Sequence, residues 1–142
     1  MGTVNVDKLN EFLRGEISAV ETYRMALEKV EGASRTTLEE NKRSHEERVR
    51  LLREEVMRMG GEPSTTSGAW GTWAKVVEGG AKVFGEKAAI AALEEGEDHG
   101  VKEYKVDDKE LDAGVRALLA TRLLPAQQQT HSRLSALKKQ LS

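Results

Sequence analysis

Apolar residues recur at spacings of three, four and seven along much of this chain, and this periodicity restricts its fold more than any other feature. One such stripe comprises Leu9, Phe12, Leu13, Val20, Leu27 and Val30. The next comprises Leu38, His45, Val49, Leu52, Val56 and Met59. This spacing is typical of amphipathic α-helices. We therefore predict one helix from about residue 7 to 31 and a second that is capped by Ser34 or Thr36 and ends near residue 60.

The connections between helices predict two hairpins. Gly32 follows the first stripe as a helix C-cap, so the short link after it forces the first two helices to run antiparallel. A third helix is expected from about Glu86, and a fourth ends near Leu141, with a turn within residues 106–114. Pro125 falls inside the fourth helix, where its missing N–H predicts a kink. We expect one domain over residues 1–142, with hairpins at 7–60 and 86–141.

Residues 61–85 predict a crossover between the hairpins. Their first part is rich in glycine, proline and small hydroxyl residues, as expected of a loop. Beyond it Trp70, Trp73 and Val77 fall at helical spacing and predict a short helix. The loop and helix together reach roughly 50 Å, more than the roughly 39 Å length of a 26-residue helix. The second and third long helices are therefore predicted to run parallel, with the tryptophans packed on the bundle; a partner surface is the alternative.

The composition excludes several classes of function. The chain has 142 residues, no cysteine, and 22 basic against 24 acidic residues without a basic block. We expect no nucleic-acid partner, no disulfide and no thiolate metal ligand. No apolar run approaches the roughly 20 residues of a spanning helix, and no signal peptide is recognisable. The expected location is the cytoplasm, without a membrane partner. A homo-oligomer and an unidentified protein partner stay open.

An imperfect duplication points polar residues into the predicted core. Residues 15–24 and 96–105 share the pattern G-E-x-x-small-V-x-x-Y-basic, which includes both tyrosines of the chain. Residues 42–45 and 128–131 match more loosely, and each ends in histidine. These residues follow the apolar stripes and lie about equally far from the two hairpin turns. We therefore predict that four side chains meet in one buried layer: Glu16, His45, Glu97 and His131.

The pattern resembles the ferritin-like superfamily, whose bundles carry a glutamate on each of two helices and Glu-x-x-His on the other two. The E-x-x-A-x-x-x-Y of Glu16, Ala19 and Tyr23 resembles the first helix of rubrerythrin-type members. Residues 15–27, 60–84 and 86–104 are similar to a family of small bacterial ferritin-like bundles of unknown function. The resemblance implies a ferritin-like four-helix bundle with one long crossover, and a metal site as its ancestral feature.

The sequence departs from that pattern where the bridging glutamates should stand. Lys42 and Gln128 occupy the positions three residues before His45 and His131. One hypothesis is therefore a degenerate, metal-free polar network in which Lys42 pairs with Glu16 or Glu97. The alternative is an oxidase with one or two iron or manganese ions on the four predicted ligands. A structural or stress-associated interaction protein is a third hypothesis.

The remaining candidates receive plainer interpretations. Glu94 lies one turn from Glu97 and is kept as a reserve ligand or salt-bridge partner. His99 should point away from the predicted site, because two residues correspond to about 200° around a helix. Tyr23 and Tyr104 are interpreted first as core side chains that find one polar partner each, and alternatively as donors to the carboxylates or redox groups.

Overall fold

Two helical hairpins joined by a crossover make up the fold in the computed structural model, which describes residues 2–105 and 109–141. The first hairpin consists of α1 (Gly2–Lys29) and α2 (Ser34–Arg58). The crossover contains the 3₁₀ turn η1 (Gly68–Gly71) and α3 (Thr72–Phe84). The second hairpin consists of α4 (Glu86–Tyr104), α5 (Ala113–Leu118), the π-helical turn η2 (Leu119–Leu123) and α6 (Leu124–Leu141). No strand occurs in the described residues.

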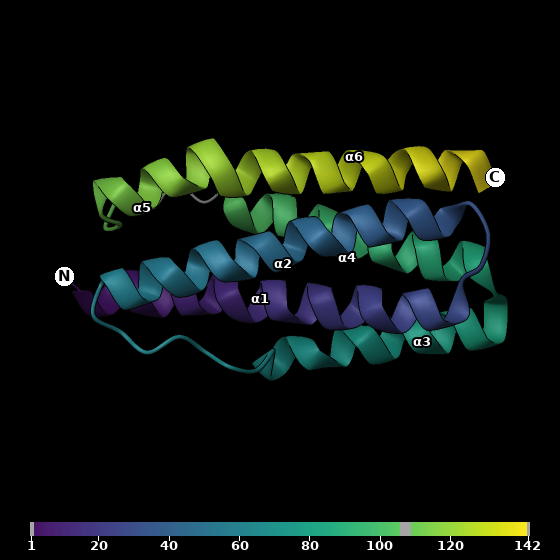
Figure 1. Ribbon diagram of the computed structural model, residues 1–142, viewed down its shortest axis with the longest axis horizontal. Coiled ribbons are helices and arrows are strands. Elements are labelled where there is room, and N and C mark those ends of the chain that lie inside the picture. The colour runs from purple at the N-terminus through teal and green to yellow at the C-terminus, as the bar shows by residue number, and fades with distance from the viewer. Residues whose placement is uncertain (1, 106–108, 142) are drawn as a thin grey trace.

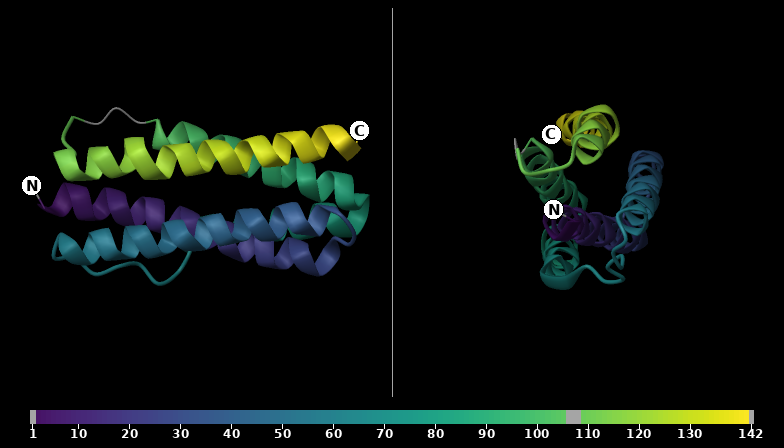
Figure 2. Two further views of the ribbon diagram at one scale, coloured as in Figure 1. Left: turned by 45° about the horizontal axis from the view of Figure 1, so that its top comes forward. Right: turned by 90° about the vertical axis from the view of Figure 1, so that its left-hand side faces the viewer.

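The predicted direction of the helices is confirmed. Figure 1 shows α2 and α4 running the same way, with α3 carrying the chain back along the length of the molecule. The long helices α1, α2, α4 and α6 lie side by side, and α3 lies outside them against α1 and α4 (Figure 2). Gly32 and Gly85 adopt φ of 81° and 87° at the two tight turns, a conformation that glycine adopts without strain.

Two apolar clusters fill the two ends of the molecule. One gathers residues from α1, α2, the end of α4 and the segment 111–123, namely Leu9, Phe12, Leu13, Leu52, Val56, Tyr104, Leu111, Val115, Leu119 and Leu123. The other gathers residues from the first hairpin, α3, α4 and α6, namely Tyr23, Ala26, Val30, Leu38, Val77, Ala89, Ile90, Leu93, Leu134 and Leu137. Burial of this apolar surface is the main source of stability. The polar residues of the repeat lie between the two clusters.

A helix boundary and a predicted distortion differ from expectation. Helix α1 begins five residues earlier than predicted. The irregularity near Pro125 is a π turn just before it, in which the N–H of Leu124 bonds to the carbonyl of Leu119. A wide turn is one way in which a helix accommodates a missing N–H. Residues 106–108 of the predicted turn lie outside the described residues.

Candidate functional site

The two copies of the repeat exchange hydrogen bonds across the core. Glu16 and Tyr23 lie seven residues apart on α1, and so do Glu97 and Tyr104 on α4, so each pair occupies one helix face. The Tyr23 hydroxyl donates to Glu97, and the Tyr104 hydroxyl donates to Glu16. Each tyrosine therefore serves the glutamate of the other copy. The contact to a carboxylate accounts for the polar partner that each buried tyrosine needs.

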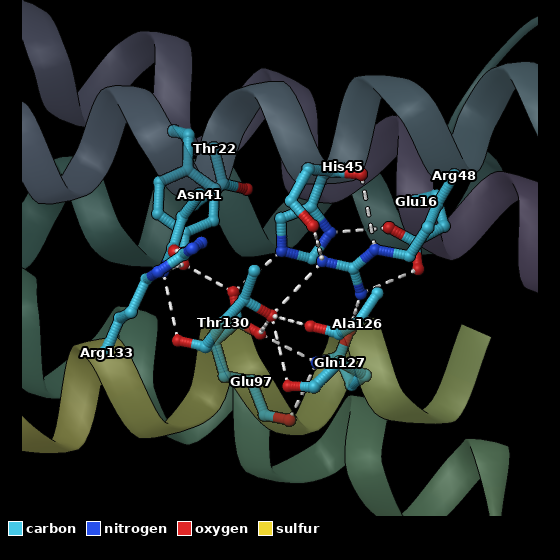
Figure 3. A network of polar contacts seen from close by, with 12 residues as sticks. Glu16, Thr22, Asn41, His45, Arg48, Glu97, Ala126, Gln127, Thr130 and Arg133 are labelled. Carbon is cyan, nitrogen blue, oxygen red and sulfur yellow. Dashed lines mark hydrogen bonds and ion pairs between the residues drawn. The ribbon is translucent and has the colours of Figure 1, made fainter. Parts of the chain in front are cut away.

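His45 bridges the two carboxylates from α2. Its Nδ1 lies 2.5 Å from Oε1 of Glu16, and its Nε2 lies 2.7 Å from Oε2 of Glu97 (Figure 3). An ionised carboxylate only accepts hydrogen bonds, so both ring nitrogens must carry a proton. Burial and the charge of Arg48 lower the pKa of His45, but the two carboxylates outweigh them and raise it. The geometry therefore defines an imidazolium held between two glutamates.

Arg48 supplies the second buried cation. Its side chain is 1% exposed, and its guanidinium donates to Glu16 at 3.3 Å and to the Gln127 carbonyl. It also donates to the hydroxyls of Ser44 and Thr130, both at 3.1 Å. With Glu16, Glu97 and His45 ionised, the layer holds two negative and two positive charges. Removal of charges from water is costly, and this local neutrality together with hydrogen bonding offsets that cost.

Helix α6 completes the layer with neutral groups. The Gln127 amide donates to the Glu97 carboxylate at 2.8 Å and to its backbone carbonyl at 2.9 Å, and the Thr130 hydroxyl donates to the same carboxylate at 2.6 Å. Gly100 makes room for this contact, because a Cβ there would lie 2.4 Å from the Gln127 amide nitrogen. Within the described residues, every buried side-chain nitrogen or oxygen has a hydrogen-bond partner.

The electrostatics of the layer favour the ionised glutamates. Burial raises the pKa of Glu97. The charge and hydrogen bond of His45 and the hydroxyls of Thr130 and Tyr23 have a larger, opposite effect and bring this pKa down to about 2. Burial opposes ionisation of Glu16 as well, but Arg48 and His45 lower its pKa overall. Burial and the adjacent carboxylates raise the pKa of both tyrosines, which therefore stay protonated donors.

The structure brings three of the four predicted residues together and places the fourth elsewhere. Glu16, His45 and Glu97 meet in the buried layer, whereas His131 is 30% exposed and lies 3.8 Å from Asp98. The predicted convergence of His131 is wrong, because Thr130, one residue earlier and 0% exposed, takes the inner position of α6. Gln128 lies exposed on the surface.

The predicted role of Lys42 is also wrong. Its ammonium lies 3.9 Å from Glu46 on the outside of α2, and Asn41, one residue earlier, is buried in its place. The Asn41 amide donates to the Tyr23 hydroxyl at 3.1 Å and to the Thr130 carbonyl at 3.0 Å. A buried cation does balance the glutamates, as charge balance requires, but it is Arg48.

Four members of the layer were not predicted from the sequence: Asn41, Arg48, Gln127 and Thr130. Arg48 lies three residues after His45 and four before Leu52, so it continues the apolar stripe of α2 and was detectable by its spacing. The reserve ligand Glu94 lies outside the layer and accepts hydrogen bonds from Ser135 and Lys138. His99 points away from the layer, as predicted, and is 58% exposed.

The arrangement does not fit a metal ion. A histidine ligand must offer a nitrogen lone pair, but both nitrogens of His45 face carboxylates as hydrogen-bond partners. The Arg48 guanidinium also lies against Glu16, where a second cation would be repelled. Among the described residues, no group of three or more histidine, aspartate or glutamate side chains is arranged to hold a metal. The chemistry of this donor set is that of a hydrogen-bonded salt-bridge network.

The chain belongs to the family described as Domain of unknown function (DUF2383), whose sequence pattern matches residues 4–106. The match includes Glu16, His45, Arg48 and Glu97 and ends before α5 and α6. No significant match was found among curated proteins or among solved structures. No helix in the described part of the chain has the length and apolar character needed to cross a membrane.

Proposed function

We propose that this protein is a ferritin-like four-helix bundle in which a metal-free network occupies the place of an ancestral metal site. Support comes from the duplicated hairpins, the single crossover and the resemblance of the repeat to ferritin-like bundles. Under this proposal His45 and Arg48 supply the positive charge that metal ions supply in the ancestral arrangement. The network then acts as a rigid, charge-neutral layer that fixes how the two hairpins pair.

The contact of both His45 nitrogens with carboxylates carries this proposal. A metal oxidase of iron or manganese requires the same imidazole to lose a proton and turn a lone pair towards the metal, and it requires Arg48 to leave Glu16. Either change leaves carboxylates without their present partners. The metal-free network keeps all of these contacts. A structural role in pairing the two hairpins is therefore the function that the geometry supports best.

Metal titration tests the proposal. We expect no stoichiometric binding of ferrous iron, Mn²⁺ or Zn²⁺ to protein purified without chelator, measured by elemental analysis and by anaerobic calorimetry. The double variant Lys42→Glu, Gln128→Glu should gain no buried metal site, because both side chains face outward. Stoichiometric binding that Glu97→Gln abolishes and the exposed control Glu47→Gln retains would overturn the proposal.

A second proposal is an interaction role for the crossover, favoured by an apolar strip on α3. Val76, Val83 and Phe84 are 53%, 70% and 78% exposed, although large apolar side chains are usually buried. Sedimentation of the wild type and of Val83→Ser, Phe84→Ser tests for self-association through this strip. A concentration-dependent dimer that the double variant abolishes would support it, and a monomer at every concentration would exclude self-association.

A further inference from the structure

A cleft of about 490 Å³ opens beside the polar layer, between α1, α4 and the crossover where η1 meets α3. Its volume falls in the range of sites for small organic molecules, roughly 300–1,000 Å³. The buried polar groups Glu16, Tyr23, His45, Glu97 and Tyr104 form part of its lining. The cleft therefore joins the interior network to the surface of the molecule.

Trp70 and Trp73, the only tryptophans of the chain, are fixed at this cleft. The Trp70 carbonyl accepts a 2.6 Å hydrogen bond from Ser18 of α1, and its ring lies 4.9 Å from the ring of His99 on α4. Trp73 rests on the backbone of α4, because a Cβ on Gly96 would lie 2.5 Å from its indole nitrogen. Contacts with α1 and α4 therefore fix the two tryptophans in the absence of a ligand.

The carboxylate of Glu103 gives this cleft an acidic group that could bind a ligand. Its half-buried carboxylate lines the cleft, and its nearest basic group is His99, at 3.9 Å. No lysine or arginine in the described residues forms an ion pair with it. Burial and the charges of Glu11 and Glu16 outweigh the opposing effect of Lys8 and raise the pKa of Glu103 to about 7. Glu16 and Glu97 lie against the buried cations His45 and Arg48, whereas within residues 2–105 and 109–141 no buried cation lies beside Glu103.

We propose that the cleft binds a small organic cation, with an ammonium group against Glu103 and an apolar body against Trp70 and Trp73. A carboxylate without a strong cationic partner provides the charge complement. Indole faces attract ammonium groups and also cover apolar surface, so the two features select the same kind of ligand. The proposal does not depend on the metal-free interpretation of the neighbouring layer, since Glu103 takes no part in that network.

Protonated benzylamine is a suitable probe, with benzyl alcohol as its neutral analogue and benzoate as its anionic one. Tryptophan fluorescence reports on the cleft directly, because both tryptophans line it, and calorimetry gives the stoichiometry. We expect benzylamine to bind one site at least fivefold more tightly than benzyl alcohol, and benzoate to bind most weakly. Glu103→Gln should remove the preference for the cation, whereas Glu78→Gln, on the exposed side of α3, should leave it unchanged.

The pH dependence sharpens the test. Between pH 6 and pH 8 Glu103 changes from mostly protonated to mostly ionised, while benzylamine stays cationic. The affinity of the wild type should therefore rise about tenfold over this range, and that of Glu103→Gln should stay flat. Binding of benzylamine no tighter than benzyl alcohol, an unchanged preference in Glu103→Gln, or no binding up to about 10 mM would overturn the proposal. Melting curves by circular dichroism establish that the variants are folded.

Discussion

The two hairpins contribute equally to the carboxylates of the central layer but unequally to its positive charge. Glu16 with Tyr23 on α1 matches Glu97 with Tyr104 on α4, and their crossed hydrogen bonds obey an approximate two-fold relation. The partner helices break it, because α2 brings the cations His45 and Arg48 while α6 brings the neutral Gln127 and Thr130. A change at His45 or Arg48 on α2 leaves a buried charge without its counter-charge, whereas a change at Gln127 or Thr130 on α6 removes hydrogen bonds to those charges but no charge itself. The difference predicts unequal energetic costs.

Arg48→Met should cause the largest loss. It leaves two buried carboxylates opposite a single imidazolium, and removal of one partner of a buried ion pair costs about 3 to 5 kcal/mol. Urea unfolding at pH 7 measures this loss. Arg43→Met is the matched control, because Arg43 is 74% exposed and its loss should cost less than about 0.5 kcal/mol. Equal stabilities of the two variants would show that the layer does not require the buried cation.

The pH dependence of stability should also change in Arg48→Met. In the wild type, Glu97 has a pKa of about 2 against an ordinary 4.5, so its contribution is complete above pH 4.5 and is lost as the pH falls towards 2. Without Arg48, a proton on Glu16 can replace the missing charge, since burial then dominates its pKa. The deficit of Arg48→Met relative to the wild type should therefore shrink between pH 7 and pH 5. A constant deficit would contradict this account.

Thr130→Val should cost about 1 to 2 kcal/mol, less than the loss of Arg48. Its hydroxyl donates to Glu97 and accepts from Arg48, and valine fills nearly the same volume without either bond. His131→Ala on the neighbouring position should cost less than about 0.5 kcal/mol. A larger loss for His131 than for Thr130 in thermal unfolding would mean that α6 presents the face predicted from the repeat.

A glycine on each of the two repeat helices, Gly100 on α4 and Gly15 on α1, provides a smaller test of how closely the layer is packed. Gly100→Ala should displace the Gln127 amide and weaken its bonds to Glu97 and Arg48, a loss of about 1 kcal/mol. Gly15→Ala meets only a Glu103 oxygen at 3.9 Å, so the better helix propensity of alanine should give a gain of up to about 1 kcal/mol. Opposite signs in urea unfolding support the account, and a stabilising Gly100→Ala would count against it.

Lys42→Ala should have the smallest effect. The lysine lies on the outside of α2 with a weak contact to Glu46, so its loss should change the free energy of unfolding by less than about 0.5 kcal/mol. Parallel urea titrations of this variant and Arg48→Met would show which of the two cations balances the buried glutamates. A loss near 3 kcal/mol for Lys42→Ala would mean that Lys42 pairs with the glutamates after all.

The sequence predicted the directions of the helices, the crossover and three members of the layer, but not which of two adjacent residues faces inward. Leu38 and His45 lie seven residues apart, and either Asn41 or Lys42 between them satisfies helical spacing. Likewise, either Thr130 or His131 fits between Gln127 and Leu134. In both cases the smaller neutral residue lies inside. Spacing cannot decide between them, because the decision depends on desolvation and on how neighbouring helices pack.

The protonation of His45 is the most direct test of the central claim. Nitrogen-15 NMR of histidine-labelled protein, assigned with His99→Gln and His131→Gln, reports on both ring nitrogens of each of the three histidines. We predict that His45 carries a proton on Nδ1 and on Nε2 at pH 7, and that it loses one only at a pH above its ordinary pKa of 6.5. Its stabilising effect should be complete below pH 6.5 and decline as the pH rises through the raised pKa. A neutral His45 at pH 7, with one bare nitrogen able to bind added Zn²⁺, would contradict the account.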